Sequence, residues 1–302
     1  MGSDRIFTGL GLRLFAILCL TLMAALAKLA STMGTTLIEI IFFRQLFAIP
    51  VAVAWLATSP GGIATVRTNK LGAHAWRTLA GLLGMIANFS AVLLLPLAEA
   101  TTLQFTVPIF ATLLGAFLLG EHVGGYRWGA VVAGLAGVLV VAQPSGGHFP
   151  LVGTLIGLAG ALLVALIAIL LRQLGRTESA GTTVFWFSLF TMVPLGPAYL
   201  FVAQPHDLHV WAILLSVGLV GGVGQIAITA ALRYAPVSAV VPMDYSGLIW
   251  ATLYGWLFFN VLPTATTWIG APLIIASGLV IVWRERVRHQ AVSAVTAADT
   301  PA

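Results

Sequence analysis

The most informative stretch of the sequence is Pro236–Val261, which reads PVSAVVPMDYSGLIWATLYGWLFFNV. It is long and apolar enough to cross a bilayer, yet it carries Asp244 inside the apolar run. A carboxylate at that depth costs at least about 2.5–3.5 kcal/mol on insertion scales, so it normally faces a cavity or a protein partner rather than lipid. Two prolines, Pro236 and Pro242, lie at the start of the stretch, and a broken membrane helix requires neighbours or water that satisfy its backbone. We therefore expect this helix to border a cavity or a partner.

The first half of the chain contains a counterpart, Pro96–Glu121, which reads PLAEATTLQFTVPIFATLLGAFLLGE. The two stretches align without a gap at an offset of 140 residues. The matched pairs are Pro96/Pro236, Ala111/Ala251, Thr112/Thr252, Leu113/Leu253, Gly115/Gly255 and, further along, Trp128/Trp268. Thr36–Pro50 also aligns with Ala180–Pro194, at an offset of 144. The sequence therefore predicts a duplicated membrane protein.

The composition excludes an ordinary soluble domain, because 60% of the 302 residues are hydrophobic and only 8% are charged. The single cysteine, Cys19, and histidines without metal-ligand spacing argue against a metal site. Nucleotide-binding loops of the GxxxxGK[ST] or GxGxxG type are absent from the sequence, so we expect no cofactor. The net charge of +5 comes from basic residues scattered through short connections, which argues against nucleic-acid binding.

Ten apolar runs have the length of a membrane-spanning helix. They lie at roughly Leu12–Ser31, Leu37–Ala57, Ala75–Leu95, Thr101–Leu119, Tyr126–Ala142, Leu151–Leu171, Thr183–Val202, Val210–Leu232, Val237–Phe259 and Thr266–Trp283. We expect an all-α membrane protein with a first five-helix repeat over residues 1–146 and a second over 147–289. Residues 290–302 are small and polar and are expected to form a disordered cytoplasmic tail.

The basic residues predict the orientation of these helices, since cytoplasmic connections carry an excess of Lys and Arg. With the N-terminus inside, the inner segments and helix ends hold Arg5, Arg13, Arg67, Lys70, Arg77, Arg127, Arg172, Arg176, Arg233, Arg284, Arg286 and Arg288. The outer connections hold none, so both termini are expected in the cytoplasm. Five is an odd number, so the second repeat must insert upside-down relative to the first. A 5+5 inverted-topology repeat is typical of secondary transporters that bind substrate near the membrane midplane.

Three runs resemble the drug/metabolite transporter superfamily, and more narrowly the bacterial EamA-type exporters. They are FTVPIFATLLGAFLLGE (Phe105–Glu121), VVPMDYSGLIWATLYGWLFF (Val240–Phe259) and WIGAPLIIASGLVIVWRE (Trp268–Glu285). The resemblance implies export of small metabolites from the cytoplasm, with amino-acid exporters of the YddG type as the best-understood relatives. One departure is that the second repeat has Asn260-Val261 where such proteins commonly repeat the Gly-Glu seen at Gly120-Glu121.

Asp244 is the strongest candidate for a functional side chain. As a buried carboxyl group it is a candidate for proton coupling or for anchoring a substrate ammonium. The structural alternative is a carboxylate bonded to a neighbouring hydroxyl or paired with a buried cation. The adjacent Tyr245 has a ring that suits either substrate contact or plain packing.

Three further residues are predicted to contact substrate or to join helices. Gln104 and Phe105 lie in the repeat partner of the Asp244 region, and Asn88 lies inside the third helix. Uncharged polar side chains in membranes either line a polar cavity or bond across helices. Both interpretations stay open for Gln104 and Asn88, and Phe105 is predicted to contact substrate beside Gln104.

Lys28, near the outer end of the first helix, is a candidate for binding a substrate carboxylate, with extension toward the lipid headgroups as the alternative. Glu39 and Arg44 on the second helix are candidates for an outer gate or for a pair that only fixes orientation. They are five residues apart, which is not a favourable spacing within one helix. Arg44 therefore needs Glu39, Glu99 or a carbonyl on a neighbouring helix, and Glu99 itself is expected in a solvated outer turn.

Together these observations predict a secondary transporter of the bacterial inner membrane that works by alternating access. The expected substrates are small metabolites, preferably amino acids, moved outward, with the bilayer as its environment and protons as a candidate coupling ion. A multidrug or nucleoside/sugar-type carrier of the same fold is the nearest alternative, followed by a channel. A membrane-embedded enzyme is disfavoured because the polar groups in the apolar runs are few and dispersed.

Overall fold

The structure is a computed structural model that describes residues 3–59, 62–68, 71–118, 120, 123–142, 151–174, 180–235 and 237–298. Every regular element in that part of the chain is helical. The elements are α1 (Ser3–Thr32), α2 (Leu37–Thr58), η1 (Gly62–Val66), α3 (Leu71–Leu94), α4 (Leu97–Gln104), α5 (Val107–Leu118), α6 (Gly125–Ala142), α7 (Leu151–Leu174), α8 (Ala180–Val202), α9 (Leu208–Tyr234), α10 (Val237–Val240), η2 (Val241–Ser246), α11 (Gly247–Phe259) and α12 (Ala265–Ala298).

Eight stretches of these helices are long and apolar enough to cross a membrane. They are Ile6–Thr32, Leu37–Thr58, His74–Leu94, Leu97–Leu118, Gly125–Ala142, Gly181–Val202, Leu208–Tyr234 and Ala265–Arg284. The helix α7 and the composite stretch α10–η2–α11 are two further apolar passages through the bundle. The prediction of a multi-pass, all-helical membrane protein with about ten membrane helices is thus confirmed.

The predicted fourth helix is broken, although its sequence suggests one continuous element. It begins earlier than predicted, at Leu97, and is interrupted at Phe105 and Thr106 between α4 and α5. The backbone N–H groups of these two residues donate to the carbonyls three positions back, at 3.1 Å each. Pro108 has no N–H to continue the α-helical pattern, so the chain tightens locally before α5 begins.

The predicted ninth helix is also interrupted, as its two prolines suggest. A short helix, α10, leads into the 3-10 segment η2, which contains Pro242, Asp244 and Tyr245, and α11 follows. A 3-10 segment inside a longer helix often marks a hinge. Pro236 lies outside the described residues.

The departure from the Gly-Glu pattern keeps the same backbone conformation. Asn260 ends α11 with φ of 53°, and Gly120, at the equivalent position of the first repeat, has φ of 63°. Both values lie in the left-handed region, which asparagine tolerates better than most other side chains. Asn260 therefore replaces the glycine of this pattern without changing the end of the helix; Glu121 lies outside the described residues.

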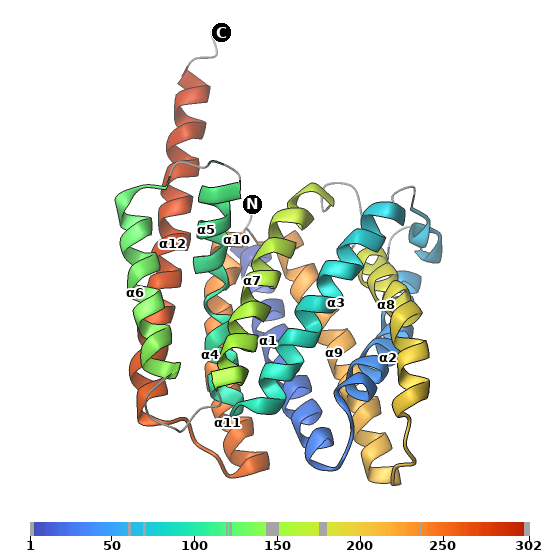
Figure 1. Cartoon of the computed structure of the whole chain (residues 1–302). Coiled ribbons are helices and arrows are strands. Elements are labelled where there is room, and N and C mark those ends of the chain that lie inside the picture. The colour runs from blue at the N-terminus through green and yellow to red at the C-terminus, as the bar shows by residue number, and fades with distance from the viewer. Residues whose placement is uncertain are drawn as a thin grey trace.

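The helix α1 begins, and α12 ends, on the same side of the bundle (Figure 1). We call this side the terminal face, and the opposite side, where α1 ends, the distal face. The helix α12 extends beyond the bundle to Ala298. The disordered tail expected from Gln290 stays a prediction.

The two halves of the chain interlock rather than pack as separate domains. The most extensive contacts join α1 to α9, α6 to α12, α3 to α7, and α2 to both α8 and α9. Small residues allow these helices to approach closely. A Cβ atom added at Gly81 would lie 2.6 Å from the Phe187 ring, and one at Gly221 would lie 2.5 Å from Met23 Sδ. Gly81 and Gly221 occupy equivalent positions of the two predicted repeats.

Candidate functional site

The two helix interruptions meet inside the bundle. The rings of Phe105 and Tyr245 contact each other edge to face, with centroids 5.0 Å apart. The residues that follow them make matching bonds: Thr106 Oγ1 donates to the Leu103 carbonyl at 2.6 Å, and Ser246 Oγ donates to the Met243 carbonyl at 2.7 Å. Hydroxyl groups thus satisfy carbonyls near each interruption, as a broken helix in a membrane requires.

Asp244 forms an ion pair with Arg13 of α1. Arg13 Nε donates to Oδ1 and Arg13 Nη2 donates to Oδ2, both at 2.5 Å, which makes the contact bidentate. The side chain of Arg13 is 10% exposed and that of Asp244 is 30% exposed. Of the alternatives for Asp244, the structure gives the pairing with a buried cation. Such two-point contacts fix geometry as well as adding energy.

The sequence reasoning missed Arg13 as a site residue, since it assigned this arginine to the cytoplasmic positive charge. The available signal was its position inside the apolar stretch Ile6–Thr32. A charged residue within a membrane helix normally needs a partner, and few carboxylates occur in the apolar runs. The separation of 231 positions between Arg13 and Asp244 concealed the pair.

Two polar groups in the segments of the two interruptions are buried without a hydrogen-bond partner among the described residues. They are Gln104 Nε2 and Tyr245 Oη. The tyrosine hydroxyl lies against Gly278 of α12, where an added Cβ would overlap it. The structure therefore brings together Phe105 and Tyr245, each next in the chain to a polar residue, Gln104 and Asp244; we call these four residues the hinge cluster. Asn88 lies elsewhere, where α3 crosses α7 close to Gly160.

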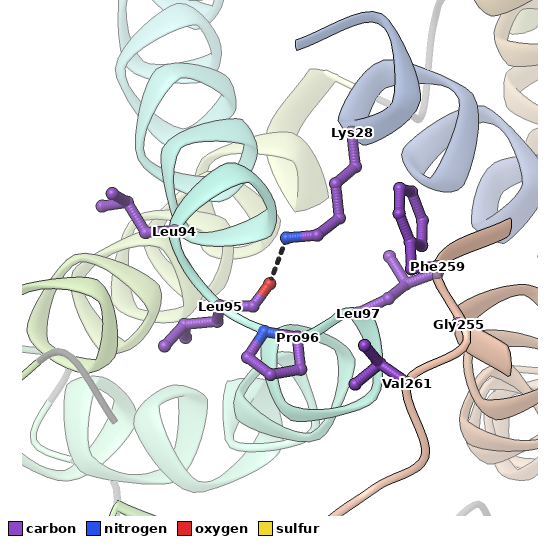
Figure 2. Close-up of a pocket in the computed structure, with 8 residues that line it drawn as sticks. All are labelled: Lys28, Leu94, Leu95, Pro96, Leu97, Gly255, Phe259 and Val261. Carbon is purple, nitrogen blue, oxygen red and sulfur yellow. Dashed lines mark hydrogen bonds between the residues drawn. The ribbon is translucent and has the colours of Figure 1, made fainter. Parts of the chain in front are cut away.

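Lys28 lies on the wall of a cavity of about 240 Å³ near the distal face. Figure 2 shows its side chain reaching from α1 toward the turn at Leu95 and Pro96, with Phe259 nearby at the end of α11. The cavity is lined by Lys28, Leu94, Leu95, Pro96, Leu97, Gly255, Phe259 and Val261.

The Lys28 ammonium caps the C-terminal end of α3. Nζ donates to the carbonyls of Leu95, Val92 and Leu93 at 2.6, 2.9 and 3.3 Å. An ammonium has three donors, and a cation is favourable at the negative end of a helix. These bonds engage Lys28 with the end of α3 in this structure, and its contact with substrate stays a prediction.

Glu39 binds the distal connections instead of Arg44. Its Oε2 accepts from the backbone N–H and the hydroxyl of Thr36, at 2.7 and 2.9 Å, which completes a capping box at the start of α2. Its Oε1 accepts from Gln204 N at 3.3 Å and contacts His206 Nε2 at 2.9 Å. Glu39 is fully buried and joins the start of α2 to the connection between α8 and α9.

Glu99 makes a comparable contact and is not solvated as predicted, since its exposure is 1%. Its Oε1 accepts from Thr264 N at 3.3 Å and from Thr267 Oγ1 at 3.1 Å. Both carboxylates considered as partners of Arg44 are therefore engaged with connections on the distal face.

Arg44 contacts neutral groups only, within the described part of the chain. Its Nη1 lies 2.6 Å from Gln45 Oε1 and 2.8 Å from Met85 Sδ, and its Nε lies 3.3 Å from Met23 Sδ. The Phe89 ring centroid is 5.7 Å from the guanidinium carbon. The predicted Glu39–Arg44 pair is not formed. Among the described residues, His, Cys, Asp and Glu form no group suited to hold a metal ion.

A model of the EamA-like transporter family matches the chain twice, over residues 7–143 and 151–283. Similar proteins include the pseudopaline exporter CntI of Pseudomonas aeruginosa, which is 28% identical over 92% of this chain and 96% of its own length. The riboflavin transporter of Rhizobium johnstonii is 30% identical over 76% of each chain. The S-adenosylmethionine uptake transporter of Rickettsia conorii is 26% identical over 92% of this chain and 94% of its own.

A solved crystal structure has the same fold, with a TM-score of 0.61 over 93% of this chain and 98% of the other at 20% identity. The names of the relatives indicate transporters and not enzymes. Because the family model covers nearly all of both halves, the chain belongs to the EamA-like transporter family, within the drug/metabolite transporter superfamily.

Proposed function

We propose that this protein is a secondary transporter that moves small metabolites, preferably amino acids, out of the cytoplasm across the bacterial inner membrane by alternating access. The observation that carries the proposal is the contact between two interrupted membrane helices, with a buried ion pair beside it. Secondary transporters bind substrate where discontinuous helices of two repeats meet near the midplane. The Phe105–Tyr245 contact, with ring centroids 5.0 Å apart, is such a meeting point.

An inverted arrangement of the two halves is part of this proposal. The family model matches each half separately, and five helices per half require opposite insertion. The contact pattern is consistent with it: exchanging the halves converts the pair α1–α9 into the pair α7–α3. The same exchange leaves α2–α8 and α6–α12 unchanged.

The ion pair and the cavity suggest how access would alternate. Both lie along α1, with Arg13 toward the terminal face and Lys28 toward the distal face. Between them the same face of α1 meets α11, where a Cβ at Gly247 would lie 3.4 Å from Ile17 and 3.8 Å from Thr21 Oγ1. We propose that the Arg13–Asp244 pair closes the path at the terminal face while the cavity beside Lys28 belongs to its distal end.

The proposed orientation has the terminal face in the cytoplasm, because the basic residues at helix ends and connections concentrate there. Outward transport of a metabolite agrees with the exporter among the relatives, while other relatives act in uptake. Proton coupling is the proposed driving force, with Asp244 as the candidate group, since it is the carboxylate of the hinge cluster.

Counterflow in proteoliposomes tests this function. Each vesicle batch is preloaded with one amino acid, and entry of trace label is followed for the wild type, for Asp244→Asn and for Phe201→Leu. Phe201 is 90% exposed and serves as the control for a surface substitution. We expect saturable exchange for a subset of amino acids in the wild type and the control.

The variant separates coupling from binding. If Asp244→Asn keeps exchange but loses proton-driven accumulation, Asp244 is the coupling group. Flux without saturation or counterflow would indicate a channel. Exchange confined to drugs, nucleosides or sugars would refute the amino-acid assignment and favour the related carrier classes.

A further inference from the structure

Arg44 is a buried cation whose charge no carboxylate neutralises within the described part of the chain. Its side chain lies in the distal half of α2, about 10 Å from the start of that helix at 1.5 Å per residue. Residue exposure is 9%, and its neighbours are an amide oxygen, two thioethers and an aromatic ring. Thioether sulfur is a weak hydrogen-bond acceptor. These neighbours therefore compensate poorly for the lost hydration of the guanidinium, and a bound anion would compensate for it better.

Two donor groups at this position have no partner among the described residues. The bonds of Arg44 use Nε and Nη1, so the donors of Nη2 are unused. Gln45 is 1% exposed, and its Nε2 is buried without an acceptor. Gln45 Oε1 accepts from Arg44 Nη1 at 2.6 Å. The amide nitrogen of Gln45 is therefore the group that can still donate to a ligand. Buried polar groups in native proteins are nearly always satisfied, so the buried and unpaired Gln45 Nε2 indicates a missing acceptor beside Arg44.

We propose that Arg44 and Gln45 bind the carboxylate of the transported substrate. A planar guanidinium matches a carboxylate in two-point geometry, and charge-assisted bonds of this kind are the strong ones. Met23, Met85 and Phe89 supply a polarizable, adaptable wall for the apolar part of the ligand. The inference rests on the proposed transport function and names the chemical class of its substrate: an organic acid or amino acid with a free carboxylate.

The position of the site suits transport because both halves contribute to it. Met23, Arg44 and Met85 come from α1, α2 and α3, while α9 of the second half contacts the stem of Arg44. A Cβ added at Gly221 would lie 3.8 Å from Arg44 Cγ and 2.5 Å from Met23 Sδ. A movement of α9 against α1 and α2 would therefore change the space around the guanidinium.

The first test measures binding independently of transport. Thermal unfolding of the detergent-solubilised protein is followed in sodium acetate, in sodium chloride at equal ionic strength, and in acetamide. We expect acetate to raise the apparent Tm, and chloride and acetamide to have little effect. Equal stabilisation by chloride would assign Arg44 to a halide site and overturn the proposal, as would the absence of any acetate effect.

Gln45→Glu is the decisive variant because it supplies an internal carboxylate where Gln45 Oε1 already meets Arg44 at 2.6 Å. We expect this near-isosteric variant to fold, to unfold at the same or a higher temperature, and to lose the acetate effect. Gln45→Met, which removes the amide but adds no charge, is the matched control and should keep the acetate effect in weakened form. A Gln45→Glu protein that still responds to acetate like the wild type refutes the site.

The second test compares counterflow of the best amino-acid substrate with that of its amide. We expect the wild type to prefer the acid, and Arg44→Gln and Gln45→Glu to lose affinity for the acid by about tenfold or more, as for loss of a charged hydrogen bond. A purely structural role of Arg44 would lower transport of acid and amide equally, which would overturn the inference. Wild-type vesicles that transport neither compound would instead refute the proposed function, while an acetate response in unfolding would still support the anion site.

Discussion

Replacement of Arg13 by glutamine should destabilise the protein more than any replacement in the loops that connect the helices. The change removes both 2.5 Å bonds to Asp244 and leaves a carboxylate uncompensated in the bundle. Breaking a buried ion pair from one side costs about 3–5 kcal/mol. Asp244 keeps 30% exposure to solvent, so we expect a cost at or just below the lower end of this range, about 2–3 kcal/mol after discounting for screening.

The assay is a double-mutant cycle on thermal unfolding in detergent. At about 2–4 °C per kcal/mol, the single variant Arg13→Gln should lower the apparent Tm by about 5–10 °C. The double variant Arg13→Gln/Asp244→Asn removes both charges together and should recover most of that loss. Arg67→Gln is the matched control, because the same substitution on this exposed connecting residue should change stability by no more than about 0.5 kcal/mol.

Alkylation of the single cysteine, Cys19, reports whether the path at the terminal face also opens in Arg13→Gln. Cys19 is 7% exposed on α1, and its Cβ would lie 3.1 Å from a Cβ added at Gly224 of α9. If the ion pair holds α1 in place, Arg13→Gln should speed alkylation of Cys19 by N-ethylmaleimide, while the control should not. Unchanged unfolding and unchanged labelling in Arg13→Gln would refute the closing role of the pair. A double variant whose loss of stability equals the sum of the losses in Arg13→Gln and Asp244→Asn would show that the two charges are not coupled.

Three further substitutions test other contacts. Gly278→Ala should lower the stability by about 1–3 kcal/mol, because the added methyl group overpacks against the Tyr245 hydroxyl. Adding Tyr245→Phe should relieve part of that loss. The control Gly129→Ala has open space around its Cβ position and should cause no measurable change in thermal unfolding. Lys28→Met should lower stability by about 1–3 kcal/mol because three carbonyls at the end of α3 lose their donor; a change in substrate KM at unchanged Tm would instead favour substrate binding. Glu39→Gln should accelerate hydrogen exchange in the connection between α8 and α9, which its carboxylate holds; unchanged exchange there would contradict this role.

The helix interruption could be predicted from the sequence in the second repeat but not in the first. The sequence predicts an interruption in the second repeat, where Pro236 and Pro242 bracket the start of the helix. In the first repeat the break falls at Phe105 and Thr106 and was not predicted. A proline within a helix is ambiguous, since Pro50 lies inside α2, which continues past it. Whether the chain breaks depends on which neighbours can satisfy the freed carbonyls.

The class of the protein could be predicted from the sequence, because the length and apolarity of a membrane helix are local properties of the chain. The duplication is likewise a property of the sequence and can be read from the offset of 140 residues between matched positions. Charged residues within the apolar runs also marked Asp244, Lys28, Glu39 and Arg44 as positions that need explanation. Such residues are conspicuous because placing a charged side chain in a membrane costs free energy.

The groups that these charged side chains contact depend on how the helices pack in three dimensions. Asp244 binds Arg13, 231 positions away, and Glu39 binds the connection at His206, 167 positions away. Lys28 caps α3, while Arg44 is left among thioethers and an amide. The physical reason is that the rotation of each helix and its register against its neighbours are set by packing of side chains across the whole bundle. An apolar run states that a helix crosses the membrane, but not which of its faces meets which partner.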